Sequence, residues 1–191
     1  MHDMQDPRRL PPGQREVRKW PRLDLGIVPR FDPATWDLRV DGEVDSPLRL
    51  DYAAFEALPS VRTTSDFHCV TGWTTFDNAW EGVTIRELAA RAKARPSARF
   101  ITFTCGDGYT TSHPLSVLLE EGVILAYRWD GQNLPDPHGG PVRLLVPKRY
   151  AYKSAKWVRQ LTFTVEEELG YWEVRGYSNT ADPWTEDRYS F

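Results

Sequence analysis

The chain has few cysteines and lacks any long apolar segment. Only two of its 191 residues are cysteine, Cys69 and Cys105, which is too few for a disulfide framework. No stretch reaches the roughly 18 consecutive apolar residues of a membrane span. The N-terminal sequence MHDMQDPRRLPPGQREVRKW contains no apolar run of the kind that a signal peptide needs. We therefore expect a soluble, cytoplasmic protein without a membrane span, in which both cysteines are free thiols.

Several common sequence signatures are also missing. The chain contains no GxGxxG, P-loop, HExxH or paired CxxC motif, which excludes the most frequent dinucleotide, phosphate and zinc sites. It has no excess of basic residues either, because the net charge is -3. The composition as a whole therefore predicts no nucleic-acid partner.

One part of the chain lacks acidic residues. Residues 138–160, HGGPVRLLVPKRYAYKSAKWVRQ, which we call the basic block, hold six cations and no acid. Such a block in an acidic protein is typical of a site that binds an anion, although a solvated strand and loop would have the same composition. The six cations are Arg143, Lys148, Arg149, Lys153, Lys156 and Arg159.

The order of the expected elements predicts one α+β domain with a mixed β-sheet. With 40% hydrophobic and 13% aromatic residues, the chain can enclose a core. Helices are expected from the N-cap Asp51 to Pro59, from the N-cap Thr84 to Pro96, and from about Pro114 to Gly122. Strands and helices do not alternate as regular βαβ units, which favours the α+β class. Strands are expected at 35–44, 61–70, 98–105, 123–129, 142–147 and 157–165.

The two ends of the chain are expected to be irregular. Residues 1–22 are rich in Pro and Arg and have no period, which predicts an extended arm that lies on the domain or is partly disordered. The domain itself is expected to span residues 23–191. Its last part contains GYWEVRGYSNTADPW, which is too rich in Gly, Pro and aromatic residues for regular structure.

Cys69 stands in the stretch DFHCVTGW, directly after His68, and several roles are open to it. A thiol in such an apolar run is compatible with simple packing. As a nucleophile it would need a base such as His113 or His138. As a zinc ligand it would join the second cysteine and two histidines at separations that match no common motif. As the single protein thiolate on a redox metal, it would need further ligands from an organic group.

Beside DFHCVTGW, the chain contains WEGVTIRELA, HGGPVRLLVPKRYAYKSAKWV and GYWEVRGYSNTADPWTEDRY in that order. Together these segments resemble the molybdopterin domain of the sulfite oxidase family, most of all its small stand-alone bacterial members, over about residues 10–190. The resemblance implies a single-domain sulfite-oxidase-type molybdopterin-binding fold. It also implies molybdopterin and molybdenum as cofactors, with Cys69 as the one protein ligand of the metal and the dithiolene of the pterin as another.

The resemblance assigns further residues to the cofactor. His138 and Arg143 match the pterin-binding pair of the family, and Ser154, Ala155 and Lys156 match its phosphate-side loop. An arginine fork and a lysine are suited to hold phosphate or pterin carbonyl groups. Backbone amides of a loop can add an anion-binding nest. This assignment would explain why the basic block has no acids.

Other residues are implied more loosely. Cys105 stands where relatives carry a threonine that touches the cofactor, with a packed thiol as the alternative. Arg30 and Phe31 match an N-terminal stretch that reaches the pterin. Tyr109 and His113 are candidates for the substrate pocket, Tyr109 as a hydrogen-bond donor to a metal oxo group.

The chain departs from true sulfite oxidases beside the metal cysteine. Those enzymes have an arginine immediately before it, which helps to hold sulfite, whereas this chain has His68. An unperturbed histidine has a pKa of about 6.5, so His68 is a candidate for binding an oxyanion or relaying a proton. Because side chains alternate along a strand, the alternative is that His68 points away from Cys69 into the core.

The implied reaction is a two-electron oxygen-atom transfer on a small oxyanion or a sulfur or nitrogen oxide, X + H2O giving XO + 2H+ + 2e-, or its reverse. The haem and immunoglobulin-like domains of animal sulfite oxidases are missing, so a separate electron-transfer partner is expected, such as a haem protein, a quinone-linked subunit or another carrier. Two other interpretations stay open. One is a cofactor-free domain that binds an anion or a protein through the basic block, and the other is a cysteine-dependent hydrolase.

Overall fold

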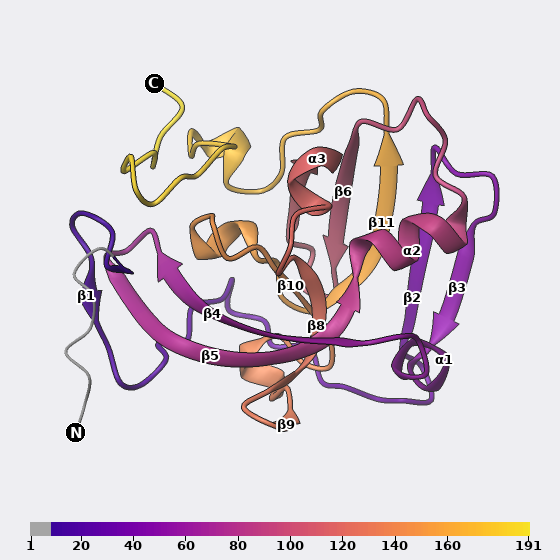
Figure 1. The fold of residues 1–191 in the computed structure, drawn as a ribbon, viewed down its shortest axis with the longest axis horizontal. Helices are drawn as coiled ribbons and strands as arrows, with labels where there is room; N and C mark the ends of the chain where they lie inside the picture. The colour runs from indigo at the N-terminus through magenta and orange to yellow at the C-terminus, as the bar shows by residue number, and fades with distance from the viewer. Residues whose placement is uncertain (1–8) are drawn as a thin grey trace.

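Two β-sheets form the framework of the chain (Figure 1). The computed structural model describes residues 9–191. The six-stranded sheet contains β1 (Arg15–Glu16), β4 (Val61–Cys69), β5 (Trp73–Thr84), β8 (Ile124–Trp129), β9 (Gln132–Asn133) and β10 (Arg143–Leu145). The five-stranded sheet contains β2 (Asp37–Gly42), β3 (Leu48–Asp51), β6 (Phe100–Cys105), β7 (Thr110–Pro114) and β11 (Val158–Thr164).

Both sheets are mixed, and the helices are short. β5 pairs with β1 in parallel and with β4 and β8 in antiparallel orientation, and β11 pairs with β2 in parallel and with β6 in antiparallel orientation. The predicted α+β class is confirmed, with two mixed sheets in place of one. The helical elements are α1 (Tyr52–Glu56), α2 (Ile85–Ala92), α3 (Leu115–Leu118) and the 3-10 turns η2 (Asp136–His138), η3 (Ala151–Lys153) and η4 (Glu173–Arg175).

The main core lies between the two sheets and α2. The five-stranded sheet contributes Leu38 and Phe103, the six-stranded sheet contributes Val83 and Leu125, and α2 contributes Leu88, all of them fully buried. Burying one such side chain is worth about 1.5–3 kcal/mol. This shared core therefore holds the two sheets, and with them the loops at their ends, in a fixed relation.

The helix caps predicted from the sequence are present. The side chain of Asp51 accepts a hydrogen bond from the backbone N–H of Ala54 at 2.8 Å, and Thr84 accepts one from the N–H of Glu87 at 3.1 Å. Each bond satisfies an amide at the start of a helix that has no partner within the helix. The starts of α1 and α2 are thus encoded locally.

The sequence does not predict five of the strands, β1, β3, β5, β7 and β9, and the two longest of these show why. β7 lies where only a turn and a helix are expected, and α3 ends at Leu118 rather than at Gly122. Thr111, Ser112 and His113 of β7 are consecutive and all buried, so the alternation that reveals a half-buried strand is absent. β5 is missed for another reason, since Asp77 in its middle has a left-handed backbone (φ 55°) that interrupts the period of two.

The described part of the arm, residues 9–22, is extended and lies on the domain. β1 pairs with Trp73 and Thr74 of β5. Trp20 packs edge-on against Phe67 and Trp129, with ring centroids 4.8 and 4.7 Å apart. The predicted arm also includes residues 1–8, which lie outside the described residues. Among the described helices, none is long and apolar enough to cross a membrane.

A buried ion pair attaches the C-terminal segment, residues 170–191, to the domain. Lys153 Nζ lies 2.5 Å from Glu173 Oε1, and the two side chains are 0% and 1% exposed. Lys153 Nζ also donates to the carbonyl of Ser112 at 2.7 Å and to Asn179 Oδ1 at 2.5 Å. Thr111 donates to Glu173 at 2.7 Å. These bonds join β7, η3 and η4 in one buried polar cluster.

Removing one partner of this pair should destabilise the fold strongly. Lys153→Met is expected to lower the free energy of unfolding by about 3–5 kcal/mol, because it leaves Glu173 as an uncompensated buried carboxylate. The double variant Lys153→Met/Glu173→Leu should cost less than the single one. Urea denaturation measures both. The control is Lys148→Met, which breaks a surface pair with Glu120 and should cost about 1 kcal/mol or less. Equal stability of Lys153→Met and the wild type would contradict this account.

Candidate active site

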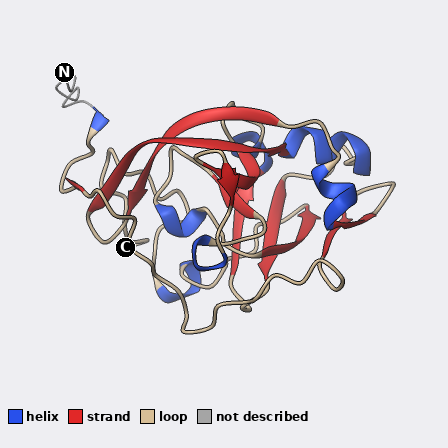
Figure 2. Cartoon of the chain, turned by 90° about the horizontal axis from the view of Figure 1, so that it is seen from below, coloured by secondary structure: helices blue, strands red, loops and turns tan. Residues whose placement is uncertain are grey.

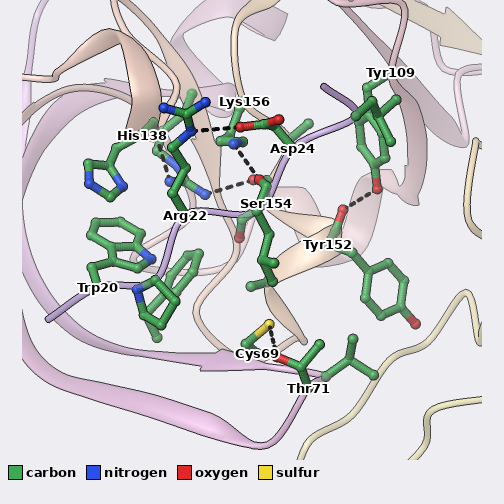
Figure 3. Close-up of a pocket in the computed structure, with 18 of the residues that line it drawn as sticks. Trp20, Arg22, Asp24, Cys69, Thr71, Tyr109, His138, Tyr152, Ser154 and Lys156 are labelled. Atoms are coloured by element: carbon green, nitrogen blue, oxygen red, sulfur yellow. Dashed lines mark hydrogen bonds and ion pairs between the residues drawn. The ribbon is translucent and has the colours of Figure 1, made fainter. Parts of the chain in front are cut away.

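A cavity with a volume of about 310 Å³ lies where the arm, the β4–β5 hairpin and the basic block meet (Figure 3). Its size is within the range of small-molecule sites, about 300–1,000 Å³. In Figure 3, Cys69 and Thr71 lie at the bottom, whereas His138 and Arg22 lie at the upper left and Lys156 lies near the top centre, beside Asp24. The cavity thus has a thiol side and a cationic side.

Cys69 is the last residue of β4 and faces the cavity. It pairs with Trp73 of β5, and the short hairpin loop between them ends in the left-handed Gly72 (φ 93°), as is common in such loops. The thiol Sγ lies 3.2 Å from the hydroxyl oxygen of Thr71. Burial raises the pKa of Cys69, and the Thr71 hydrogen bond and the charge of Arg188 oppose this rise.

His68 does not share the cavity with Cys69. Its Nδ1 lies 2.9 Å from the hydroxyl oxygen of Thr74, and its ring contacts Trp184 at a centroid distance of 6.0 Å. Burial lowers the pKa of His68. Successive side chains of a strand point to opposite faces, so of the two predicted placements the structure shows the one away from Cys69. A direct role of His68 at the substrate is not supported.

Arg143 is a fully enclosed cation on the other side of the cavity. Its Nη1 donates to the carbonyl of His138 at 2.8 Å and its Nη2 to the carbonyl of Ser154 at 3.0 Å. The guanidinium lies 5.1 Å from the ring centroid of Trp20 and 4.9 Å from that of Phe67. Burial lowers the pKa of Arg143 to about 9. Within residues 9–191 no carboxylate pairs with it, and its Nε has no hydrogen-bond partner.

Lys156 adds a second cation close to Arg143. Its Nζ donates to the carbonyl of Leu23, the first residue after the arm, at 2.5 Å and lies 4.2 Å above the ring of Trp157. Burial and the neighbouring charge of Arg143 lower the pKa of Lys156 to about 8. The pKa values of both cations are thus lowered, because burial disfavours their charged forms. Such lowered values are typical of charges that a bound anion would stabilise.

The remaining predicted residues of the basic block also line the cavity. His138 stacks on Trp20 with centroids 4.8 Å apart, and burial lowers its pKa. Ser154 accepts a hydrogen bond from the N–H of Val146 at 2.9 Å, and Ala155 follows it in the lining. The structure therefore brings together the five residues assigned to the pterin and its phosphate, His138, Arg143, Ser154, Ala155 and Lys156.

Four other predicted residues do not line the cavity. Arg30 is exposed, and Phe31 packs against the main core. Cys105 ends β6 within that core, where burial raises its thiol pKa well above the usual value. His113 is buried on β7 with its Nε2 2.8 Å from the carbonyl of Lys153. Burial also holds the pKa of His113 well below its usual value. Cys105 and His113 are thus packing residues, which was the alternative for Cys105.

Tyr109 reaches the cavity, but its hydroxyl is already engaged. The hydroxyl donates a hydrogen bond to the carbonyl of Tyr152 at 2.5 Å. Burial raises the pKa of Tyr109 well above its usual value. The predicted role as a donor to a metal oxo group would require breaking that bond. In this structure Tyr109 instead holds the segment that carries Tyr152 against the cavity.

Sequence reasoning misses several lining residues. Trp20 and Arg22 come from the arm and Asp24 from just after it, and no local pattern predicts that an irregular segment would fold over a site far along the chain. Tyr152 lies within the basic block, in which the cations and not the tyrosines indicated a function in the sequence. Thr71 could have been found, because it follows Cys69 by two positions in the same motif.

The structure argues against the simplest alternatives for Cys69. Over residues 9–191, no group of three or more His, Cys, Asp or Glu side chains could hold a metal ion, so the predicted zinc alternative does not form. In the described part of the chain no histidine bonds to the Cys69 thiol, whose side-chain partner is Thr71. A histidine-activated nucleophile is therefore not assembled.

The cavity does fit the cofactor that the resemblance implies. A single thiolate is a suitable protein ligand for a soft redox metal whose other ligands come from an organic group. The unpartnered Nε of Arg143 and the half-buried side chain of Lys156 can meet carbonyl and phosphate groups. The aromatic side chains beside Arg143, Trp20 and Phe67, also line the cavity and suit a flat ring system.

Comparisons with known proteins agree with this geometry. Residues 25–172 match the family described as oxidoreductase molybdopterin binding domain. The chain is 39% identical over 184 residues to the oxidoreductase YuiH of Bacillus subtilis, covering 96% of this chain and 93% of that protein. It is 27% identical to the protein-methionine-sulfoxide reductase catalytic subunit MsrP of Campylobacter jejuni, covering 80% of this chain and 57% of that protein.

A solved structure supports the fold. The sulfane dehydrogenase SoxCD from Paracoccus pantotrophus matches with a TM-score of 0.68 and 23% identity over 73% of this chain and 40% of that chain. The family match decides against the cofactor-free binding domain and the cysteine-dependent hydrolase. The chain belongs to the oxidoreductase family defined by the molybdopterin-binding domain, and it is a molybdopterin-dependent oxidoreductase of the sulfite oxidase type, with molybdopterin and molybdenum as its cofactors.

Proposed function

We propose that Cys69 is the protein ligand of the molybdenum. The observation that carries the proposal is the position of its thiol, which lines the cavity opposite the cations. Burial raises the pKa of the free thiol, but a coordinating metal deprotonates a thiol outright. Thr71, 3.2 Å from Sγ, can then donate its hydroxyl hydrogen to the thiolate and orient it.

The cationic side of the cavity would hold the organic part of the cofactor. The free Nε–H of Arg143 supplies a fixed donor for a carbonyl or phosphate oxygen. Lys156 supplies a mobile charge, and the Ser154 hydroxyl, which already accepts from Val146, has its own hydrogen to donate. Trp20 and His138 form one wall. These residues bind and orient the group, and together they exclude water from it.

The reaction we propose is a two-electron oxygen-atom transfer on a small oxide. When bound, the molybdenum group supplies this exchange, X + H2O giving XO + 2H+ + 2e- or its reverse. The side of the cavity near Cys69 is lined by neutral groups such as Thr71 and Tyr152, and the cations lie on the far side. His68 does not offer a charge there. This arrangement favours a neutral sulfur or nitrogen oxide over the sulfite dianion.

The names of the relatives support the same class of substrate. The relative MsrP is named as the catalytic subunit of a protein-methionine-sulfoxide reductase, and this name supports a sulfoxide as the first substrate to test. We propose that a separate carrier, such as a haem protein or a quinone-linked subunit, exchanges electrons with this chain. The cytoplasmic location stays a prediction of the sequence.

Replacing Cys69 with Ser should remove the activity and leave the fold intact. The loss is expected to exceed the roughly 100-fold that removal of an outer-shell partner costs, because the metal would lose its protein ligand. Activity is measured with sulfite, sulfoxides, nitrate and chlorate, using dye acceptors or donors, on protein made in a host that synthesises molybdopterin. Sulfoxide should be turned over faster than sulfite.

The matched control is Cys105→Ala, because Cys105 is buried in the core outside the cavity. This variant should keep its molybdenum and its turnover. Full turnover by Cys69→Ser would refute the proposed role of Cys69. Faster turnover of sulfite than of any neutral oxide by the wild type would refute the proposed substrate class.

Cofactor retention should depend on pH through Lys156. The pKa of Lys156 is lowered to about 8, so in the free protein the ammonium loses its proton as the pH rises through that value. A neutral amine no longer attracts a phosphate, and a charged hydrogen bond is worth about 1.5–3 kcal/mol. The affinity should therefore fall by about tenfold or more above pH 8. Molybdenum and pterin fluorescence after gel filtration at a series of pH values measure this.

Lys156→Arg is the control, because a guanidinium stays charged throughout this range. Its retention should be flat across the pH at which the wild type loses cofactor, and Lys156→Met should retain cofactor weakly at every pH. The same pH profile in all three proteins would show that Lys156 does not hold an anionic part of the cofactor.

A further inference from the structure

The turn that follows Cys69 is held by both ends of the chain. We call residues 69–72 the Cys69 turn. The carbonyl of Cys69 accepts from the N–H of Gly72 at 2.9 Å and from Nε2 of Gln14 in the arm at 3.0 Å. The carbonyl of Val70 accepts from Nη1 of Arg188 in the C-terminal segment at 2.8 Å. Two side chains from opposite ends of the sequence thus bond to adjacent carbonyls at the thiol.

The placement of the chain ends agrees with these bonds. Figures 1 and 2 both show β1 and the C-terminal segment at the same end of the long β4–β5 hairpin. The backbone N–H of Arg15 donates to the carbonyl of Gly72 at 3.0 Å. A Cβ added to Gly72 would lie 3.3 Å from the carbonyl oxygen of Gly13. The arm therefore packs directly on the backbone of the Cys69 turn.

Gln14 and Arg188 also share a buried neighbour. Tyr150 is fully buried, and the guanidinium of Arg188 lies 5.7 Å from the centroid of its ring. The backbone N–H of Tyr150 donates to the carbonyl of Ala181 at 2.8 Å, which ties it to the C-terminal segment. Burial raises the pKa of Tyr150, and Arg188 and Gln14 both oppose this rise. The three side chains form one cluster outside the cavity lining.

The positive charge of Arg188 is only partly neutralised by its ion-pair partner. Its side chain is 25% exposed, and its ion-pair partner Glu186 lies at 3.4 Å with half of its side chain exposed. Such a pair is weak. Nη1 of Arg188 donates to the carbonyl of Val70, directly after Cys69, at 2.8 Å, so the charge lies beside the Cys69 turn. A positive charge near a redox metal also favours the reduced state, which carries more negative charge.

We propose that Gln14 and Arg188 are positioning residues for the metal centre. Gln14 fixes the carbonyl of Cys69, and Arg188 fixes the carbonyl of Val70 and holds the reduction potential of the metal at a higher value. This inference rests on the proposed role of Cys69 as the metal ligand. It assigns to the arm and the C-terminal segment, which are irregular in sequence, a function at the site that lies between them.

The test of the charge is a redox titration of the holoenzyme. Arg188→Met should shift the reduction potential, followed by the Mo(V) electron paramagnetic resonance signal, to a more negative value. Arg188→Lys keeps the charge and should stay closer to the wild type. Arg91→Met is the matched control, because it removes an exposed arginine of α2 that pairs with Glu87 and lies outside the cavity. An unchanged potential in Arg188→Met would overturn the electrostatic part of the proposal.

The test of positioning uses Gln14→Met, which keeps the size of the side chain but cannot donate a hydrogen bond. Its Mo(V) signal should change in g-values or broaden, and it should lose molybdenum faster on dialysis than the wild type, with an unchanged melting temperature in the metal-free form. Wild-type spectra and retention in Gln14→Met would overturn the positioning role. If the wild-type signal persisted in Cys69→Ser, the proposed function itself would fail, so the two failures are distinguishable.

Discussion

The burial of the Arg143 guanidinium is the constraint around which the site is arranged. A buried charge is costly unless polar groups surround it, and no carboxylate in residues 9–191 pairs with this one. The carbonyls of His138 and Ser154 and the rings of Trp20 and Phe67 offset part of that cost. These partners come from the arm, β4 and the basic block, so satisfying one cation assembles three walls of the cavity. An anionic or carbonyl group in the cavity would add the remaining partner for the buried guanidinium.

The thiol side of the cavity depends on a different principle, the alternation of a strand. Cys69 ends β4 facing the cavity, and the residue before it, His68, is turned to Thr74 and Trp184. The position that carries an arginine in true sulfite oxidases therefore carries no cation toward the Cys69 side of the cavity here. The cations that line the cavity, such as Arg143 and Lys156, lie on its far side instead, and Arg188 near Cys69 bonds to the backbone outside the cavity lining. This separation is the physical basis for expecting a neutral oxide.

The sequence predicted Cys69 and the basic-block part of the cavity lining, but not the part that distant segments contribute. Cys69 and the residues around Arg143 lie in motifs whose composition is unusual, and caps such as those of Asp51 and Thr84 are local bonds, so both could be found. β7 could not be found, because Thr111, Ser112 and His113 are all buried and leave no period of two. Trp20 was not predicted either, because its role depends on contacts between segments that are distant in the sequence. His113 and Cys105 were misplaced because residue type alone does not show which face of a strand is buried in the core.

The central claim is that Cys69 binds the molybdenum, and X-ray absorption at the molybdenum edge tests it most directly. The claim predicts that the metal in the wild-type protein has one more sulfur neighbour than the metal in Cys69→Ser, while Cys105→Ala matches the wild type. An identical sulfur count in the wild type and in Cys69→Ser would contradict it.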